Sequence, residues 1–175
     1  MCVIVTKKIS APKSISVSDA RQIATQIAKR SWQRKWNEDS KGRSTYELIP
    51  VVGTKIVWPR TRDIGISYGR ILLHVTNLNK DSHRTGISDT AICDCGEEEE
   101  TVTHMLLHCT KHAQARLKLT DVLEDICTSL KKKGSANDKV MMLLAPSLDD
   151  KISRSDNLIL KNALFQFIND IDKKL

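Results

Sequence analysis

The most constraining feature of this sequence is a group of three cysteines and one histidine within residues 93–109. The side chains are Cys93, Cys95, His104 and Cys109, and Gly96 directly follows the second cysteine. Thiolate sulfur and imidazole nitrogen are ligand atoms that Zn²⁺ prefers, and four of them complete a tetrahedral structural site. A chain that brings two cysteines to one ion must turn sharply, and glycine tolerates the positive φ of such a turn. The segment therefore predicts a structural zinc site.

The spacing of this motif matches zinc ligation in its second half and departs from it in its first half. Four residues separate His104 from Cys109, whereas a single residue separates Cys93 from Cys95 instead of the usual two to four. His108 and His112 are alternative ligands, because they follow His104 at four-residue intervals on one helix face. The competing interpretation is that Cys93 and Cys95 alternate along an exposed edge while His104 and Cys109 lie in an ordinary helix, with no metal bound.

Catalysis is not expected of this motif. A helical zinc protease site needs glutamate directly after its first histidine, and Met105 occupies that position here. Cys109 and His108 do not form a nucleophile and its base, because adjacent helical positions point apart. We therefore expect a chain that is not an enzyme.

Positive charge is concentrated in the first half of the chain. The net charge is +7, with 16 Lys and Arg against 7 Asp and Glu in residues 1–90, and 12 against 14 in residues 91–175. This asymmetry predicts contact with a polyanion, RNA or DNA, although a basic surface can also serve solubility alone. The candidate phosphate contacts are Arg34, Lys35, Lys41, Arg43, Arg60 and Arg62.

Composition favours an intracellular helical protein. Aromatic residues make up only 4% of the chain, which is low for a large β-sandwich. The longest apolar runs are too short to span a membrane, and the apolar start is too short for a signal peptide. Five cysteines in such a chain indicate metal ligands or free thiols, and Cys127 is expected to pack as a small hydrophobe. We expect a nuclear or cytoplasmic location and no membrane partner.

Apolar residues at three- and four-residue spacing predict helices over 20–38, 64–77, 116–133, 138–144 and about 155–171. The expected fold is mainly α, an irregular helical domain with a small zinc knuckle and short extended connectors at 45–50 and 55–59. The expected regions are a flexible leader (1–15), a basic helical region (16–90), the zinc segment (91–116) and a C-terminal helical region packing on the rest (117–175).

Several local expectations accompany this fold. Trp32 and Trp36 lie on the apolar stripe of the first helix and are expected in the core, the alternative being that they stack on bases. The acidic run 97–100 is expected to be a solvated loop, and 79–86 a polar turn. In a regular helix His104 and Cys109 would point about 140° apart, so the helix is expected to loosen or end near His108.

Three groups of residues also carry a family resemblance. They are WQRKW at 32–36 with KGR at 41–43 and LIP at 48–50, RILLHVTNLN at 70–79 with HRTG at 83–86, and the cysteine–histidine motif including its one-residue first gap. Together they resemble the segment that follows the ribonuclease H region, and the C-terminal Cys-Cys-His-Cys zinc motif, of non-LTR (LINE-type) retrotransposon polyproteins. The resemblance covers about residues 20–120.

The resemblance implies a tail, thought to contact RNA or target DNA, of a polyprotein that is a reverse transcriptase. The polymerase signature of that family is an aromatic residue, any residue and two aspartates, whereas Ser147 stands before Leu148 and the pair Asp149–Asp150 here. The chain is thus expected to be a severed tail, from a truncated element or from a host gene. The alternatives are a zinc-stapled interaction or scaffolding element that docks on a polymerase or another protein, and a nonfunctional remnant.

Overall fold

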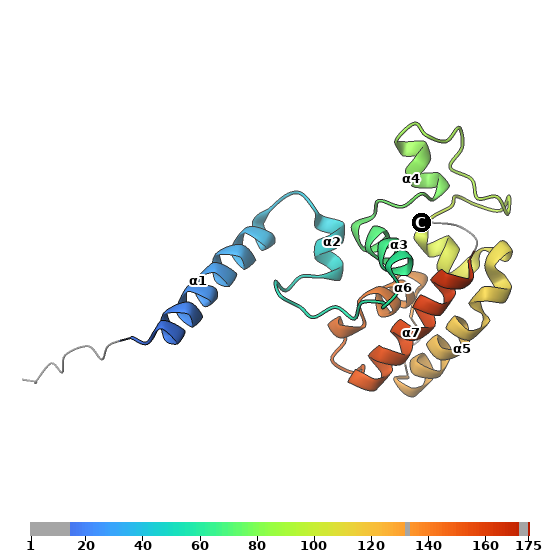
Figure 1. Ribbon diagram of the computed structural model, residues 1–175. Coiled ribbons are helices and arrows are strands. Elements are labelled where there is room, and N and C mark those ends of the chain that lie inside the picture. Colours follow the sequence, from blue (N-terminus) through green and yellow to red (C-terminus); the bar gives the residue numbers. More distant parts are fainter. Residues whose placement is uncertain (1–14, 132–133, 172–174) are drawn as a thin grey trace, which may run out of the picture.

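The computed structural model describes residues 15–131, 134–171 and 175, and it is built from helices (Figure 1). The predicted mainly-α class is confirmed: in the described part of the chain no strand occurs, and extended backbone pairs at one isolated bridge, between Ile92 and Glu99. Among the described residues, no helix is both long enough and apolar enough to cross a bilayer. The elements in order are α1 (Val17–Glu38), α2 (Arg43–Leu48), α3 (Arg62–Leu73), α4 (Asn79–Arg84), a π-helical turn (His104–His108), a 3₁₀ turn (Thr110–His112), α5 (Ala113–Ser129), α6 (Ala136–Leu144), a 3₁₀ turn (Pro146–Leu148) and α7 (Arg154–Asp170).

The core lies between α3, α5, α6 and α7, and α5 runs beside α7 (Figure 1). Helix α7 contributes the most to it, because its apolar residues recur at helical spacing on the face turned to α3 and α5. Removing each such side chain from water contributes roughly 1.5–3 kcal/mol to folding. The most deeply buried side chains include Tyr68, Leu119, Leu143, Leu160, Leu164 and Phe167.

One charged side chain is buried within this core. Lys161 of α7 is 3% exposed, and its ammonium donates hydrogen bonds to the carbonyl oxygens of Leu143 (3.0 Å) and Leu144 (2.7 Å) and to the hydroxyl of Tyr68. Leu143 and Leu144 end α6, so the lysine satisfies carbonyls that have no partner within that helix. Burial lowers the pKa of Lys161 to about 7 and raises the pKa of Tyr68.

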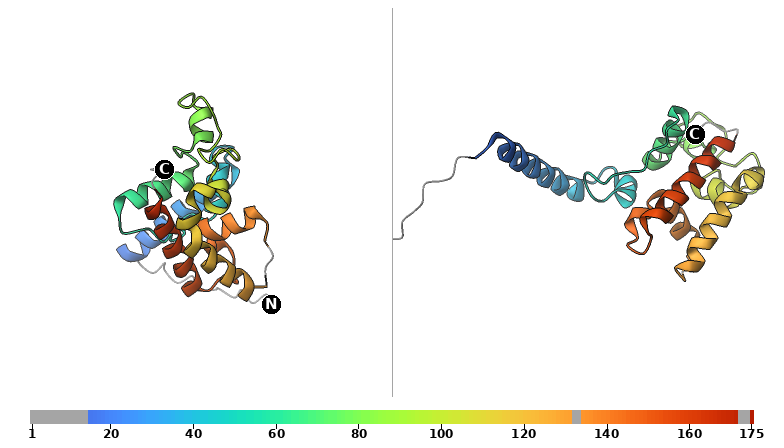
Figure 2. Two further views of the ribbon diagram at one scale, coloured as in Figure 1. Left: turned by 90° about the vertical axis from the view of Figure 1, so that its right-hand side faces the viewer. Right: turned by 60° about the horizontal axis from the view of Figure 1, so that its bottom comes forward.

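Helix α1 confirms the predicted helix, but the expected burial of its tryptophans is wrong. No residue of α1 is buried, and Trp32 is 62% exposed. The C-terminal end of α1 is held by hydrogen bonds: Trp36 Nε1 donates to the Ile49 carbonyl (2.8 Å), and the Gln33 side chain bonds to Pro50 O and Val52 N. The rest of α1 projects away from the other helices (Figures 1 and 2), and its apolar side chains Ile23, Ile27 and Trp32 are exposed.

Two short helices replace segments expected to be extended or turned. The 45–50 stretch lies largely in α2, which follows Gly42 in the left-handed region (φ 68°) and packs the guanidinium of Arg43 4.2 Å from the Tyr46 ring. The 79–84 stretch forms α4, and Glu100 Oε2 accepts a hydrogen bond from the Asn79 N–H at its first turn (2.7 Å). Glu100 lies 21 residues from Asn79, so this contact leaves no local sequence signal for α4.

Several helices begin or end at residues other than those predicted, because hydrogen bonds at the helix ends set the boundaries. Helix α3 ends at Leu73 instead of Asn77, because His74 turns left-handed (φ 54°) and its N–H bonds back to Ile71 O. Helix α5 covers Ala113–Ser129 instead of 116–133, and Ser153 is the N-cap of α7, close to the predicted start near 155. The 55–59 connector is irregular, as expected. Lys132, Lys133 and residues 1–14 of the predicted leader lie outside the described residues.

Candidate metal centre

The first two cysteines lie in a tight hairpin. The Cys93 N–H donates to Glu98 O (2.9 Å), and the Gly96 N–H donates back to Cys93 O (2.8 Å). Gly96 has a φ of 81°, a conformation that a side chain would strain, so the predicted role of this glycine is confirmed. The hairpin turns both thiols toward the segment that carries the histidine.

The histidine and the third cysteine lie on a π-helical turn. Thr101 Oγ1 accepts a hydrogen bond from the His104 N–H (3.0 Å), and the Cys109 N–H donates to His104 O (2.7 Å). This bond spans five residues, one more than in an α-helix, so the turn takes in an extra residue. His104 and Cys109, which a regular helix would point apart, therefore face the same side, and the predicted loosening near His108 is confirmed.

The four predicted ligand atoms converge on one point. The Sγ atoms of Cys93, Cys95 and Cys109 and a ring nitrogen of His104 all lie within 4.8 Å of one another. Cys93 Sγ is 3.6 Å from Cys109 Sγ, and Cys95 Sγ is 3.3 Å from His104 Nε2. A tetrahedral zinc with bonds of about 2.3 Å to sulfur and 2.0–2.1 Å to nitrogen sets edges of about 3.8 and 3.6 Å. The sulfur and nitrogen donors thus fit a metal ion such as zinc.

Carboxylates surround these ligands. Glu98 Oε1 lies 2.9 Å from His104 Nδ1, so a proton on Nδ1 leaves Nε2 free to face Cys95 and a metal. Glu100 is only 2% exposed, with Oε1 at 3.8 Å from Cys93 Sγ. The expectation of a solvated acidic loop is therefore wrong for Glu100, whereas the side chain of Glu98 is 56% exposed, as expected. Glu99 does reach solvent, where it pairs with Lys80 (2.7 Å).

Two thiols of the cluster have shifted pKa values. The backbone N–H of Glu97 holds the pKa of Cys95 down to about 7, whereas burial raises the pKa of Cys93 to about 12. A divalent cation offsets the burial penalty, because a coordinating thiol is deprotonated. Arg116 is buried beside the cluster and donates to the Cys109 carbonyl, adding positive charge close to the sulfurs.

The alternative histidines do not join the cluster. His108 is exposed, and His112 is buried with its ring against Phe167 (6.4 Å between centroids). Cys127 packs in α5 with its Sγ 3.9 Å from Met142 Sδ, as expected of a small hydrophobe. His104 is thus the histidine that the fold brings to the three sulfurs.

The predicted phosphate contacts lie away from the metal centre. Arg34 and Lys35 are exposed on α1, Lys41 is exposed in the loop after it, and Arg60 and Arg62 are exposed at the start of α3. The sixth candidate has a structural role in addition. The guanidinium of Arg43 donates to the carbonyl oxygens of Trp36 and Asn37, which closes the C-terminal end of α1.

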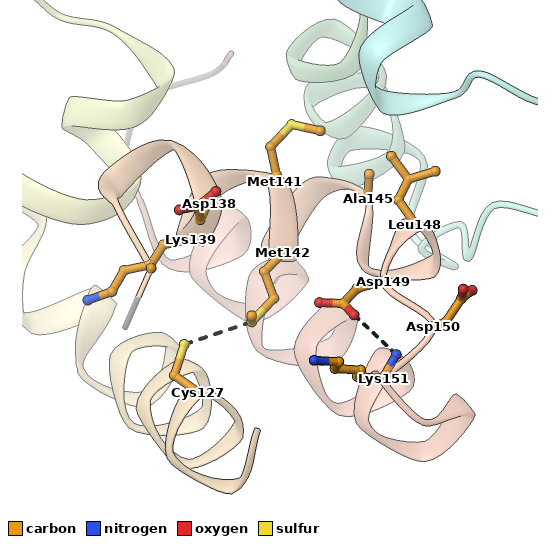
Figure 3. A pocket seen from close by; sticks show the side chains of 11 residues that line it. Cys127, Asp138, Lys139, Met141, Met142, Ala145, Leu148, Asp149, Asp150 and Lys151 are labelled. Carbon is orange, nitrogen blue, oxygen red and sulfur yellow. Dashed lines mark hydrogen bonds between the residues drawn. The ribbon is translucent and has the colours of Figure 1, made fainter. Parts of the chain in front are cut away.

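A cavity of about 610 Å³ lies between α5, α6 and the segment after α6 (Figure 3). Asp149 and Asp150 stand at its rim, and Asp149 Oδ1 accepts a hydrogen bond from the Lys151 N–H (3.1 Å). The cavity wall also carries the Cys127 thiol and Met142, which contact each other (Figure 3). Among the described residues, the group of donor side chains close enough to share a metal ion is the cysteine cluster.

Part of the chain is similar in sequence to known proteins. No protein-family model and no solved structure matches the chain. The chain is 33% identical over 87 residues to the "Retrovirus-related Pol polyprotein from type-1 retrotransposable element R1" of Bradysia coprophila, a match that covers 49% of this chain and 8% of the relative. It is 30% identical over 115 residues to "Retrovirus-related Pol polyprotein from type-1 retrotransposable element R1 3" of Nasonia vitripennis, covering 58% of this chain and 27% of that relative. The chain thus spans less than a third of the length of either relative, and it is similar to part of the Pol polyproteins of R1 retrotransposons.

Proposed function

We propose that this chain is a zinc-stabilised module that binds RNA or DNA through phosphate contacts, derived from the tail of a LINE-type Pol polyprotein. The observation that carries the proposal is the convergence of three sulfur atoms and one imidazole nitrogen from two separate segments. The similarity to R1 Pol polyproteins supports a retrotransposon origin. Its own residues are proposed to perform no catalysis.

Zinc is the proposed ion because of the donor set. Three thiolates and an imidazole favour a borderline-soft cation over magnesium or calcium, which prefer oxygen ligands. Four protein ligands leave no open position for a substrate, which is typical of a structural site. When bound, zinc would supply folding free energy by joining the hairpin that ends near Glu100 to the π turn.

The exposed cations of the first half are the proposed nucleic-acid contacts. They are Arg34, Lys35, Lys41, Arg60 and Arg62. Arg43 instead donates a hydrogen bond to the Trp36 carbonyl at the C-terminal end of α1. Arginine and lysine neutralise phosphates without reading bases, so the proposed binding depends weakly on sequence. The metal segment itself carries several acids and is proposed to act as a scaffold.

A protein-interaction role is the alternative function. It is favoured by the apolar side chains that α1 leaves exposed, Ile23, Ile27 and Trp32. A polymerase or another protein would be the partner in that case. Binding to nucleic acid at low salt separates the two roles, because a purely apolar interface gains nothing from a polyanion.

The first test is the zinc content of the purified protein. We expect one zinc per chain, and its loss together with helical signal in Cys95→Ser and in His104→Ala. His108→Ala and Cys127→Ala are the matched controls, because both residues lie outside the cluster, and they should keep the metal. A wild-type chain that folds without zinc, or a His104→Ala variant with full zinc content, would contradict the structural site.

The second test is the salt dependence of nucleic-acid binding. Five phosphate contacts predict an affinity for duplex DNA that falls about 500-fold between about 50 and 200 mM salt. Reversing two of them, Arg34→Glu with Lys35→Glu, should make that dependence shallower, measured by fluorescence anisotropy of a labelled oligonucleotide.

The matched control is Lys118→Glu with Arg154→Glu, which changes the net charge equally on exposed positions of α5 and α7. We expect this control to alter affinity much less than the α1 pair. Absence of binding to any polyanion at low salt would refute the nucleic-acid role and favour the protein-interaction role.

A further inference from the structure

Trp58 is a large aromatic side chain held at the surface. It lies in the connector between α2 and α3 and is 54% exposed. Its indole rests on two glycines of α3: a Cβ at Gly65 would stand 2.8 Å from Trp58 Nε1, and a Cβ at Gly69 would stand 3.3 Å from Cη2. A side chain at either position would crowd the indole ring. The two glycines therefore create the flat surface on which the ring lies.

The inner side of this indole is anchored to the core. Its ring meets Tyr68 edge-on, with 5.5 Å between centroids, and Tyr68 in turn meets Phe165 at 5.2 Å. Tyr68 is fully buried and bonds to Lys161. These contacts fix the orientation of Trp58, so its exposed side is a rigid aromatic surface rather than a mobile side chain.

The exposed indole lines a shallow depression of about 340 Å³. Arg62 and Arg70 line it from two turns of α3, and Ile66 and Leu73 add apolar surface. Arg70 Nη1 donates to the Leu175 carbonyl (2.6 Å), which holds that side chain in place, while Arg62 is exposed. Residues 55–73 contain four cationic side chains, Lys55, Arg60, Arg62 and Arg70, and one acidic side chain, Asp63.

We propose that Trp58 is a base-stacking site for single-stranded nucleic acid, with Arg60 and Arg62 holding the neighbouring phosphates. The inference rests on the proposed function and specifies its ligand. An aromatic platform beside guanidinium groups is how single strands are bound without reading sequence. A duplex is a poorer ligand, because its bases already stack on one another and present no free face to an indole. The local positive charge favours this occupant over an apolar peptide.

The test compares Trp58→Leu with Trp58→Phe on single-stranded oligo(dT) and oligo(rU) and on a duplex of equal length. Trp58→Leu keeps apolar area but removes the ring, so single-strand affinity should fall about 5- to 150-fold while duplex affinity stays unchanged. Trp58→Phe should recover much of the loss. The same substitution at Trp32, a comparably exposed tryptophan outside the depression, should change single-strand affinity little.

The outcomes separate this inference from the broader proposal. Equal loss on single strand and duplex, or no loss in Trp58→Leu, overturns the stacking site even when salt-dependent binding persists. Absence of all binding refutes both. Since Trp58→Leu could perturb folding, emission is also measured in Trp32→Phe with Trp36→Phe, which leaves Trp58 as the reporter. Stacking predicts quenching on saturation with oligo(dT), and unchanged emission at saturation overturns the site.

Discussion

Helices α1 and α7 begin in the same way and end in different environments. The N-cap serine Oγ accepts a hydrogen bond from the N–H of the aspartate three residues later in both, Ser16 from Asp19 and Ser153 from Asp156, each at 3.1 Å. Both carry apolar residues at helical spacing. Yet α7 buries seven residues in the core, whereas α1 buries none. An amphipathic pattern with a good cap thus predicts a helix, but not that anything covers its apolar side.

The physical basis of the difference is cooperativity with the core. Helix α7 shares its apolar face with α3, α5 and α6, so it can unfold only when those contacts break. Helix α1 is stabilised by its cap, its length and a few bonds at its C-terminal end, such as that from Trp36 to Ile49. Most helical stability in proteins comes from tertiary packing, so α1 is expected to be the less stable of the two.

The largest expected contrast comes from removing one apolar side chain from each helix. Leu164→Ala in α7 leaves a cavity in the core and should lower the free energy of unfolding by roughly 2–5 kcal/mol. Ile27→Ala in α1 removes a side chain that is 61% exposed and should change it by less than about 0.5 kcal/mol. Urea unfolding followed by circular dichroism measures both. A comparable loss in Ile27→Ala would mean that α1 packs on something in solution.

A smaller contrast concerns pH and the buried lysine of α7. The pKa of Lys161 is about 7 in the folded chain against an ordinary value of 10.5, so the unfolded chain binds more protons between these values. The free energy of unfolding should therefore rise with pH across this window, by at most about 1.4 kcal/mol per pH unit, and level off below pH 7. The hydrogen bonds from Lys161 to the Leu143 and Leu144 carbonyls favour the charged form and reduce the rise.

Lys161→Met tests the origin of that slope. We expect the variant to show a flatter dependence of unfolding free energy on pH between 7 and 10, measured by urea titration at each pH. Lys29→Met, in the exposed α1, is the matched control and should keep the wild-type slope. An unchanged slope in Lys161→Met would show that other groups cause the pH dependence.

The sequence was most informative where chemistry fixes position. The convergence of Cys93, Cys95, His104 and Cys109, the turn at Gly96 and the loosening of the helix near His108 were all predictable, because metal geometry and helical periodicity leave few alternatives. The burial of Glu100 and the contact of Glu98 with His104 were not predictable, since four consecutive glutamates carry no signal of which one is buried. For the same reason the stripe of α1 could not reveal that Trp32 stays exposed.

Local caps were predictable only in part. Ser16 caps α1 and Ser153 caps α7, whereas apolar spacing alone puts the starts of these helices at 20 and near 155. Serine and aspartate occur near both helix starts, so several registers satisfy the capping rule equally. The register that forms in α7 is selected by the burial of its apolar face, which depends on the rest of the fold.

The smallest effect, loss of a cap, distinguishes the two helices most directly. Ser153→Ala should lower the free energy of unfolding by about 1 kcal/mol, because α7 unfolds together with the core. Ser16→Ala should destabilise the first turn of α1 by a similar free energy. It should also reduce the helical circular-dichroism signal of the native state. It should leave the urea midpoint of the core unchanged, since no residue of α1 is buried against that core. If both substitutions shift the midpoint equally, α1 and α7 belong to one cooperative unit, and α1 must pack on the other helices in solution.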